Sequence, residues 1–173
     1  MLGIIVDFAR EFLLADKNFD KVLDVGSRNI NGSLKELFSG RCQEYIGLDL
    51  CDGKGVDIVA DAENLLEIFP GDTFDCVVCC ETLEHTKNPL LIVENMRKVL
   101  KPGGWLFITT PSIGHPIHDW PNDYYRFFES TFRDVFLKNY LDCVVKSMIW
   151  DSPYIVEPNS QYPHAIMGYG RKP

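Results

Sequence analysis

Several features are missing from this sequence of 173 residues, and each absence excludes a class of protein. No stretch approaches the roughly 18 consecutive apolar residues that a membrane-spanning helix requires. The first residues lack the basic start of a secretory signal, and Asp7, Arg10 and Glu11 interrupt any apolar core that such a signal would need. No internal repeat or low-complexity tract is present, which argues against repeat architectures and disordered chains.

Basic residues are in short supply. Lys and Arg number 17 against 25 Asp and Glu, so the formal net charge is −8. A partner held mainly through its phosphates requires clustered Lys and Arg. We therefore do not expect a nucleic acid as partner.

The six cysteines show neither the spacing of a zinc module nor that of a disulfide framework. Three of them, Cys76, Cys79 and Cys80, lie in one apolar run. On a strand, Cys79 would point to one face and the other two to the opposite face, so we interpret them as small buried side chains. Reduced thiols favour a cytoplasmic location.

What is present is an alternation of strand and helix patterns. Apolar runs predict strands at 21–26, 44–50, 56–62, 74–80, 105–111, 142–150 and 164–170. Helical periodicity is found at 4–14, around 34–38, at 88–100 and at 129–139. This order predicts an α/β fold with a mainly parallel sheet, which binds ligands at the carboxyl ends of its strands. We expect one domain over 1–173, in which 1–20 contain an amphipathic N-terminal helix.

Residues 111–128 form a long segment without clear periodicity, rich in proline, histidine and aromatic side chains. Long connections in compact domains are usually functional or disordered, and the aromatic content favours a functional segment. We therefore predict that 111–128 is a substrate-binding loop.

Three strand ends carry candidate ligand-binding residues. VLDVGS (22–27) runs from a strand into a turn at Gly26, where a ligand could approach the backbone. Asp49 ends the second strand, where a carboxylate typically binds ribose hydroxyls. Asp61 ends the third strand and could bond the edge of a base. The alternatives are an ordinary strand–helix turn at Gly26, a helix N-cap or a solvated strand end at Asp49, and a helix N-cap at Asp61.

Taken together, VLDVGS, YIGLDL, VADAENL and FDCVVCCETLEHTKNPLLIVENMRKVLKPGGWLFITTPS resemble the class I S-adenosylmethionine-dependent methyltransferases. The likeness covers about 21–112 and is closest to the branch related to ubiquinone and menaquinone biosynthesis. HPIHDWPNDYYRF resembles a short subgroup whose genes often accompany glycan genes. The resemblance implies a doubly wound α/β/α sandwich, a Rossmann-like methyltransferase fold whose seven-stranded sheet has an antiparallel last strand. It also implies methyl transfer to a small-molecule or glycan-related acceptor.

The resemblance also implies site residues. Asp24, Gly26 and Ser27 would lie beside the methionine part of the cofactor, Asp49 would bind its ribose, and Leu50 would cover its adenine. The remaining implied cofactor residues are Asp61, Ala62, Cys80, Glu81 and His85. His85 could instead be a capping or packing residue. The usual glycine-rich turn reads GSRNING here, with Arg28 at a glycine position. Arg28 could crowd the cofactor, fold outward or pair with a carboxylate.

On the acceptor side we expect His118 to act as general base, with His115 as the second candidate. Asp119 would orient His118, and Tyr124 and Arg126 would shape or anchor the acceptor. The alternative is that His118 and Asp119 only fix the loop. We predict no metal site. A rival interpretation of the whole chain is a non-catalytic binding module with a methyltransferase fold, supported by the atypical turn. A partner chain could complete the acceptor pocket.

Overall fold

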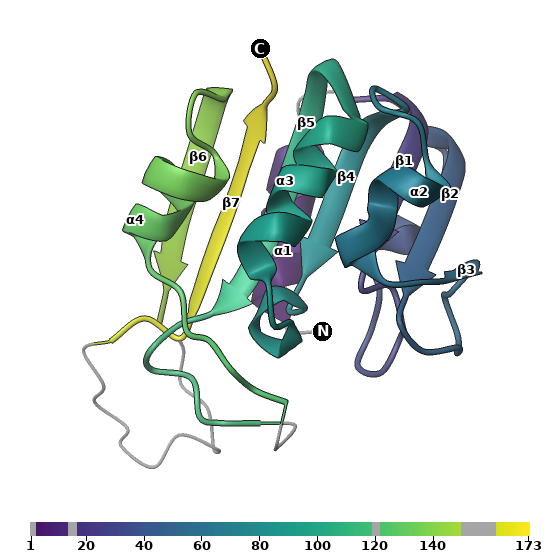
Figure 1. Cartoon of the computed structure of the whole chain (residues 1–173). Coiled ribbons are helices and arrows are strands. Elements are labelled where there is room, and N and C mark those ends of the chain that lie inside the picture. The colour runs from purple at the N-terminus through teal and green to yellow at the C-terminus, as the bar shows by residue number, and fades with distance from the viewer. Residues whose placement is uncertain (1–2, 14–16, 119–121, 150–161) are drawn as a thin grey trace.

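A computed structural model of the chain describes residues 3–13, 17–118, 122–149 and 162–173. One sheet contains all seven strands in the order β3-β2-β1-β4-β5-β7-β6 (Figure 1). The strands are β1 (Phe19–Val25), β2 (Cys42–Asp49), β3 (Ile58–Val59), β4 (Phe74–Cys80), β5 (Leu100–Pro111), β6 (Leu141–Met148) and β7 (Ala165–Arg171). Strands β1 to β5 are parallel, and β7 is antiparallel to both β5 and β6. The predicted fold is confirmed.

Helices cover both faces of the sheet. Helix α1 (Gly3–Leu13) packs on one face, and α2 (Leu65–Ile68) and α3 (Pro89–Val99) pack on the other, where α4 (Glu129–Thr131) also lies (Figure 1). Successive side chains of β5 point to opposite faces of the sheet, so this strand contributes to the packing on both faces. Phe107 faces Phe8 and Phe12 of α1, whereas Leu106 and Ile108 join the cluster that contains α3.

The cysteine run follows the same alternation. Cys79 belongs to the cluster beneath α3, whereas Cys76 and Cys80 belong to the cluster beneath α1. All six cysteines are free thiols. The interpretation of this run as small packing side chains is confirmed.

Four local predictions need correction. The helix expected around 34–38 is one 3-10 turn, η1 (Lys35–Phe38), preceded by a loop in which Asn29 Oδ1 accepts a hydrogen bond from Gly32 N. The third strand has two residues instead of seven, and Asp57 just before it accepts from Gly47 N. The fifth strand begins at Leu100, before the predicted residue 105. The segment predicted as a helix at 129–139 is α4 followed by a π turn, η4 (Phe132–Phe136).

The topology creates a switch point between β1 and β4. From β1, the chain proceeds outward to β2 and β3 on one side and to β4 and β5 on the other. In open parallel sheets, ligands bind in the crevice outside the carboxyl ends at such a point. The turns that follow β1, β2 and β4 are therefore where a site is expected.

Candidate active site

The turn after β1 is closed against the end of β2. The backbone N–H groups of Gly26 and Ser27 both donate to Leu48 O, at 2.8 and 3.1 Å. Arg28 N donates to Asp49 Oδ2 at 3.1 Å. The N–H groups that we expected to face a ligand at this turn are therefore bonded within the protein, and no long helix follows them.

Gly26 and Ser27 have packing roles. Gly26 has a φ of +81°, and the side chain of Thr82 fills the space where a Cβ would stand. The Ser27 side chain is buried and points at β2, because a Cβ at Gly47 would lie 2.7 Å from Ser27 Oγ. Ser27 Oγ has no hydrogen-bond partner among the described residues. Ser27 is thus packed between the turn and β2.

Asp24 is buried one residue before the end of β1. Its Oδ2 accepts a hydrogen bond of 2.8 Å from the hydroxyl of Tyr45. Burial raises the pKa of Asp24 to about 6, against the lowering effect of the Tyr45 bond. A neutral carboxyl is therefore favoured at this position more strongly than in the unfolded chain.

This shift predicts a pH-dependent stability. Between the unfolded pKa of 3.8 and the folded pKa of about 6, the native state binds more protons, so stability falls as pH rises through this window. Asp24→Asn keeps an acceptor for Tyr45 and removes the titration. We expect its stability relative to wild type to increase by roughly 2–3 kcal/mol between pH 4 and pH 7. Urea unfolding at both pH values measures the difference, and a pH-independent difference would contradict the prediction.

The Asp49 carboxylate is held by backbone N–H groups at the end of β2. Its Oδ1 accepts from Cys51 N at 2.9 Å, and its Oδ2 accepts from Arg28 N. Each carboxylate oxygen can accept a further bond. The adjacent Leu50 is 68% exposed, so it offers an apolar surface beside the carboxylate. The Arg28 side chain is exposed and lies along Gly53, where a Cβ would be 3.1 Å from Arg28 Cγ.

Asp61 acts as an N-cap. Its Oδ1 accepts from Glu63 N at 2.9 Å at the start of the short helix η2 (Ala62–Asn64). The alternative that we left open for this residue is therefore realised. Oδ2 accepts no hydrogen bond from the described residues, so Asp61 can cap the helix and still present one oxygen to a ligand. Ala62 follows it on η2.

Cys80 ends β4 next to the switch point, and Glu81 follows it. Glu81 has a φ of +48°, an uncommon conformation for a residue with a side chain. Its Oε1 accepts a bond of 2.9 Å from Thr109 Oγ1 on β5. Loss of solvent raises the pKa of Glu81 to about 8, with help from the negative charge of Glu84 and against the Thr109 bond. Such a strained, perturbed carboxyl is typical of a functional site.

A second group of side chains combines His85 and His118, which were predicted as site residues, with Glu84 and Asp123, which were not. The Glu84 side chain, on the 3-10 turn η3 (Leu83–His85), has no solvent exposure. Its Oε1 lies 3.5 Å from His85 Nε2 and 3.6 Å from His118 Nε2. Asp123 Oδ2 lies 3.3 Å from His118 Nδ1 and accepts from His118 N at 2.7 Å. Glu84 and Asp123 lie within the motifs LEH and DYYRF, but only the fold shows what they contact.

The loop residues predicted to bind the acceptor mostly hold the loop itself. The Arg126 guanidinium pairs with Asp123 and donates to Pro116 O at 2.9 Å and His115 O at 3.2 Å. Burial alone would raise the pKa of Asp123, but the bonds from Arg126 and His118 lower it to about 2. The Tyr124 ring is 45% exposed and is free to contact an acceptor. Asp119 lies outside the described residues.

His118 is not arranged as a simple general base. The contact with Glu84 is the main cause that raises the pKa of His118. Burial lowers this pKa, and the charge of Asp123 raises it further. Both ring nitrogens face carboxylates, so neither is directed at open space. His85 Nδ1 lies 2.8 Å from Asn122 O, which joins η3 to the 111–128 segment.

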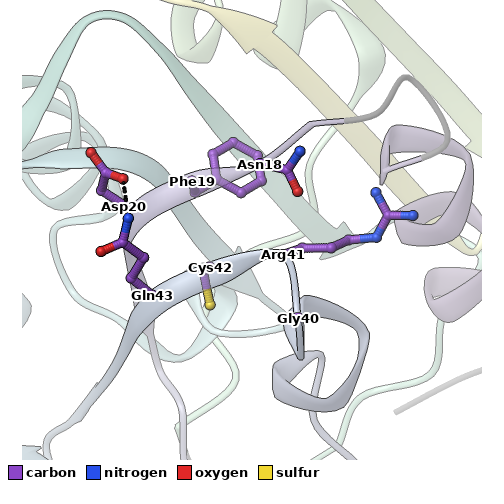
Figure 2. A pocket seen from close by; sticks show the side chains of 7 residues that line it. All are labelled: Asn18, Phe19, Asp20, Gly40, Arg41, Cys42 and Gln43. Carbon is purple, nitrogen blue, oxygen red and sulfur yellow. Dashed lines mark hydrogen bonds between the residues drawn. The ribbon is translucent and has the colours of Figure 1, made fainter.

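A shallow cavity of about 290 Å³ lies at the opposite end of the sheet (Figure 2). It is lined by the first residues of β1 and β2, including Asp20 and Gln43, which are hydrogen-bonded at 2.8 Å. The amino ends of parallel strands are not where this fold binds ligands. The candidate site is therefore the edge that carries Gly26, Asp49 and Glu81.

Comparison with known proteins shows which family the chain resembles. Residues 4–142 match the family described as "Methyltransferase domain". A ubiquinone biosynthesis O-methyltransferase of Thiobacillus denitrificans is 36% identical over 104 residues, which cover 52% of this chain and 44% of that protein. The corresponding protein of Paraburkholderia xenovorans is 51% identical over 102 residues, covering 51% of this chain and 43% of that protein. The chain thus spans less than half the length of these curated relatives.

A solved structure extends the likeness to nearly the whole fold. A SAM-dependent methyltransferase from Archaeoglobus fulgidus superimposes with a TM-score of 0.74 at 17% identity, over 98% of this chain and 94% of that one. Within the described residues, no helix is both long and apolar enough to cross a membrane. The family match over most of the chain establishes that the chain belongs to the methyltransferase domain family.

Proposed function

We propose that this methyltransferase transfers a methyl group from S-adenosylmethionine to a small-molecule or glycan-related acceptor by in-line displacement. The observation that carries the proposal is the end of β2. There the Asp49 carboxylate is fixed by two backbone N–H groups, next to the exposed apolar side chain of Leu50. The Asp49 carboxylate suits a ribose, and the Leu50 side chain suits an adenine. The Arg28 side chain lies along Gly53.

The other residues complete the proposed cofactor site. Asp61 Oδ2 and Ala62 would bind the adenine edge, and Cys80 and Glu81 would line the sulfonium end beside Gly26. Asp24, which is buried behind the turn, would lie beside the methionine part of the cofactor. When bound, the cofactor supplies an electrophilic methyl group. The protein's part is to orient the two reactants and to exclude water.

The acceptor would bind against the 111–128 segment, with Tyr124 at its surface. The curated relatives are named for ubiquinone biosynthesis, which supports a small-molecule acceptor, and HPIHDWPNDYYRF supports a glycan-related one. A nucleic acid is not proposed, because the net charge is −8. We also propose a cytoplasmic location.

The test is calorimetric titration with S-adenosylmethionine and S-adenosylhomocysteine. Asp49→Ala should weaken both affinities by about 100-fold, because each lost hydrogen bond to a charged group contributes roughly 1.5–3 kcal/mol. Asp52→Ala removes the same charge three residues away in an exposed position and should leave affinity within about twofold. Turnover is then followed as S-adenosylhomocysteine release with sugars and hydroxylated small molecules.

A second candidate function is a binding module with a methyltransferase fold that performs no chemistry. The closed turn after β1 favours it, since the N–H groups of Gly26 and Ser27 are already bonded to Leu48. No cofactor binding by a folded sample would overturn the enzyme proposal and favour this module. Cofactor binding without formation of S-adenosylhomocysteine in the presence of any acceptor tested would also favour the module.

A further inference from the structure

The cluster of Glu84, His85 and His118 is not explained by cofactor binding. One potential ligand atom from each residue lies within 4.8 Å of the other two. The two histidine Nε2 atoms are 3.5 and 3.6 Å from the same oxygen, Glu84 Oε1. Two ligand atoms each about 2.1 Å from a tetrahedral ion lie roughly 3.4 Å apart. The spacing around Glu84 is therefore close to that of a tetrahedral metal site.

Glu84 itself lacks the partners that a buried carboxylate needs. Its side chain has no solvent exposure, and neither oxygen accepts a hydrogen bond from any described residue. A buried carboxylate normally forms a hydrogen-bonded ion pair or binds a metal. Among the described residues, Glu84 Oε1 pairs with the imidazoles of His85 and His118 at 3.5 and 3.6 Å, and neither imidazole forms a hydrogen bond with it. The carboxylate is thus directed at a position that a cation would fill.

The outer contacts of both histidines are those of metal ligands. His85 Nδ1 lies 2.8 Å from Asn122 O, which leaves Nε2 without the proton when Nδ1 donates. His118 Nδ1 lies 3.3 Å from Asp123 Oδ2. A histidine that binds a metal usually donates its other ring N–H to a carbonyl or a carboxylate. His85 makes this contact with a carbonyl oxygen, whereas His118 Nδ1 faces the Asp123 carboxylate at 3.3 Å without forming a hydrogen bond.

We propose that Glu84, His85 and His118 bind a divalent transition-metal ion of the zinc type. Two imidazoles and one carboxylate suit Zn²⁺ and its analogue Co²⁺, whereas Mg²⁺ prefers oxygen ligands. The site opens on the histidine side, where the His85 and His118 side chains are 24% and 35% exposed. A water or an acceptor hydroxyl oxygen can take the fourth position there. The ion joins η3 to the 111–128 segment, and His118 is a ligand instead of the general base.

The test uses untagged protein stripped of metal with a chelator and then titrated with Co²⁺. We expect one equivalent to produce the intense visible absorption of a four- or five-coordinate Co²⁺ ion, and Zn²⁺ to abolish it. His85→Ala and His118→Ala should each lower the affinity at least 100-fold, and Asp123→Asn about tenfold, as expected for a residue that orients a ligand. His115→Ala is the matched control, since its ring lies 5.0 Å from that of His118 but outside the ligand set, and it should retain the wild-type affinity.

Each other outcome overturns the proposal. These are absence of Co²⁺ binding to folded wild-type protein, binding that survives both histidine substitutions, and competition by Mg²⁺ at equal concentration. A near-ultraviolet thiolate band would identify the exposed cysteines, Cys51 and Cys143, as the ligands instead. Circular dichroism confirms that each variant is folded. Because S-adenosylmethionine binding is titrated separately on the same samples, failure of the metal site and failure of the proposed enzyme are distinguishable.

Discussion

Gly26→Ala is expected to destabilise the protein by roughly 3 kcal/mol or more, as the sum of a left-handed backbone cost and an overpacking cost. Gly26 has a φ of +81°, and an added Cβ would lie 2.7 Å from Thr82 Cβ and closer still to the rest of that side chain. Thr82 cannot move freely, because its Oγ1 donates to Cys80 O at 2.9 Å. The substitution should therefore also displace the end of β4 and weaken S-adenosylmethionine binding.

Gly40→Ala separates the two costs. Gly40 also has a positive φ, +73°, but no atom lies within 4 Å of where its Cβ would stand. It should cost only about 1 kcal/mol and leave cofactor affinity unchanged. Urea unfolding gives both free energies, and equal losses for the two variants would show that contact with Thr82 is unimportant. Gly26→Ala combined with Thr82→Gly should recover part of the loss if the contact is responsible.

Phe12→Ala is expected to lower stability by about 3–5 kcal/mol, the range for emptying an aromatic site in a core. Phe12 of α1 is fully buried, and its ring centroid lies 4.9 Å from that of Tyr169, 5.4 Å from Phe107 and 5.7 Å from Trp105. These rings come from β5 and β7. The cavity would therefore open between α1 and the sheet.

Phe128→Ala is the matched control for Phe12→Ala, because the chemical change is the same and the Phe128 residue is 47% exposed. Its expected cost is under about 1 kcal/mol. Thermal and urea unfolding measure both variants. A loss for Phe12→Ala as small as that for Phe128→Ala would mean that α1 contributes little to stability, contrary to its packing against the rings of Trp105, Phe107 and Tyr169.

The sequence predicted best where one element determines its own environment. The apolar run at 74–80 coincides with β4, since a strand covered on both faces needs no polar alternation. The antiparallel last strand also followed from the family resemblance. In contrast, β3 begins only at Ile58, and the Asp57 side chain just before it accepts a hydrogen bond from Gly47 N of β2, a contact that no local pattern contains.

The site residues also fall into those that the sequence located and those whose roles it did not show. Asp49 and Leu50 could be located because they end a strand of recognisable type. The roles of Glu84 and His118 could not, because their contact joins two turns that are distant in sequence. Asp61 is a third case. The sequence left open whether it bonds a base or caps a helix, and the structure shows the capping bond to Glu63 N.

The position of β7 has a consequence for how the protein is made. β7 lies between β5 and β6, pairs with both, and follows both in the sequence. While a ribosome is still synthesising residues 165–171, the growing chain has one open edge on β5 and no partner for β6. Open strand edges promote pairing with other chains. We expect nascent chains that stop before residue 165 to aggregate or to need a chaperone. Chains that include residues 165–171 should neither aggregate nor need one.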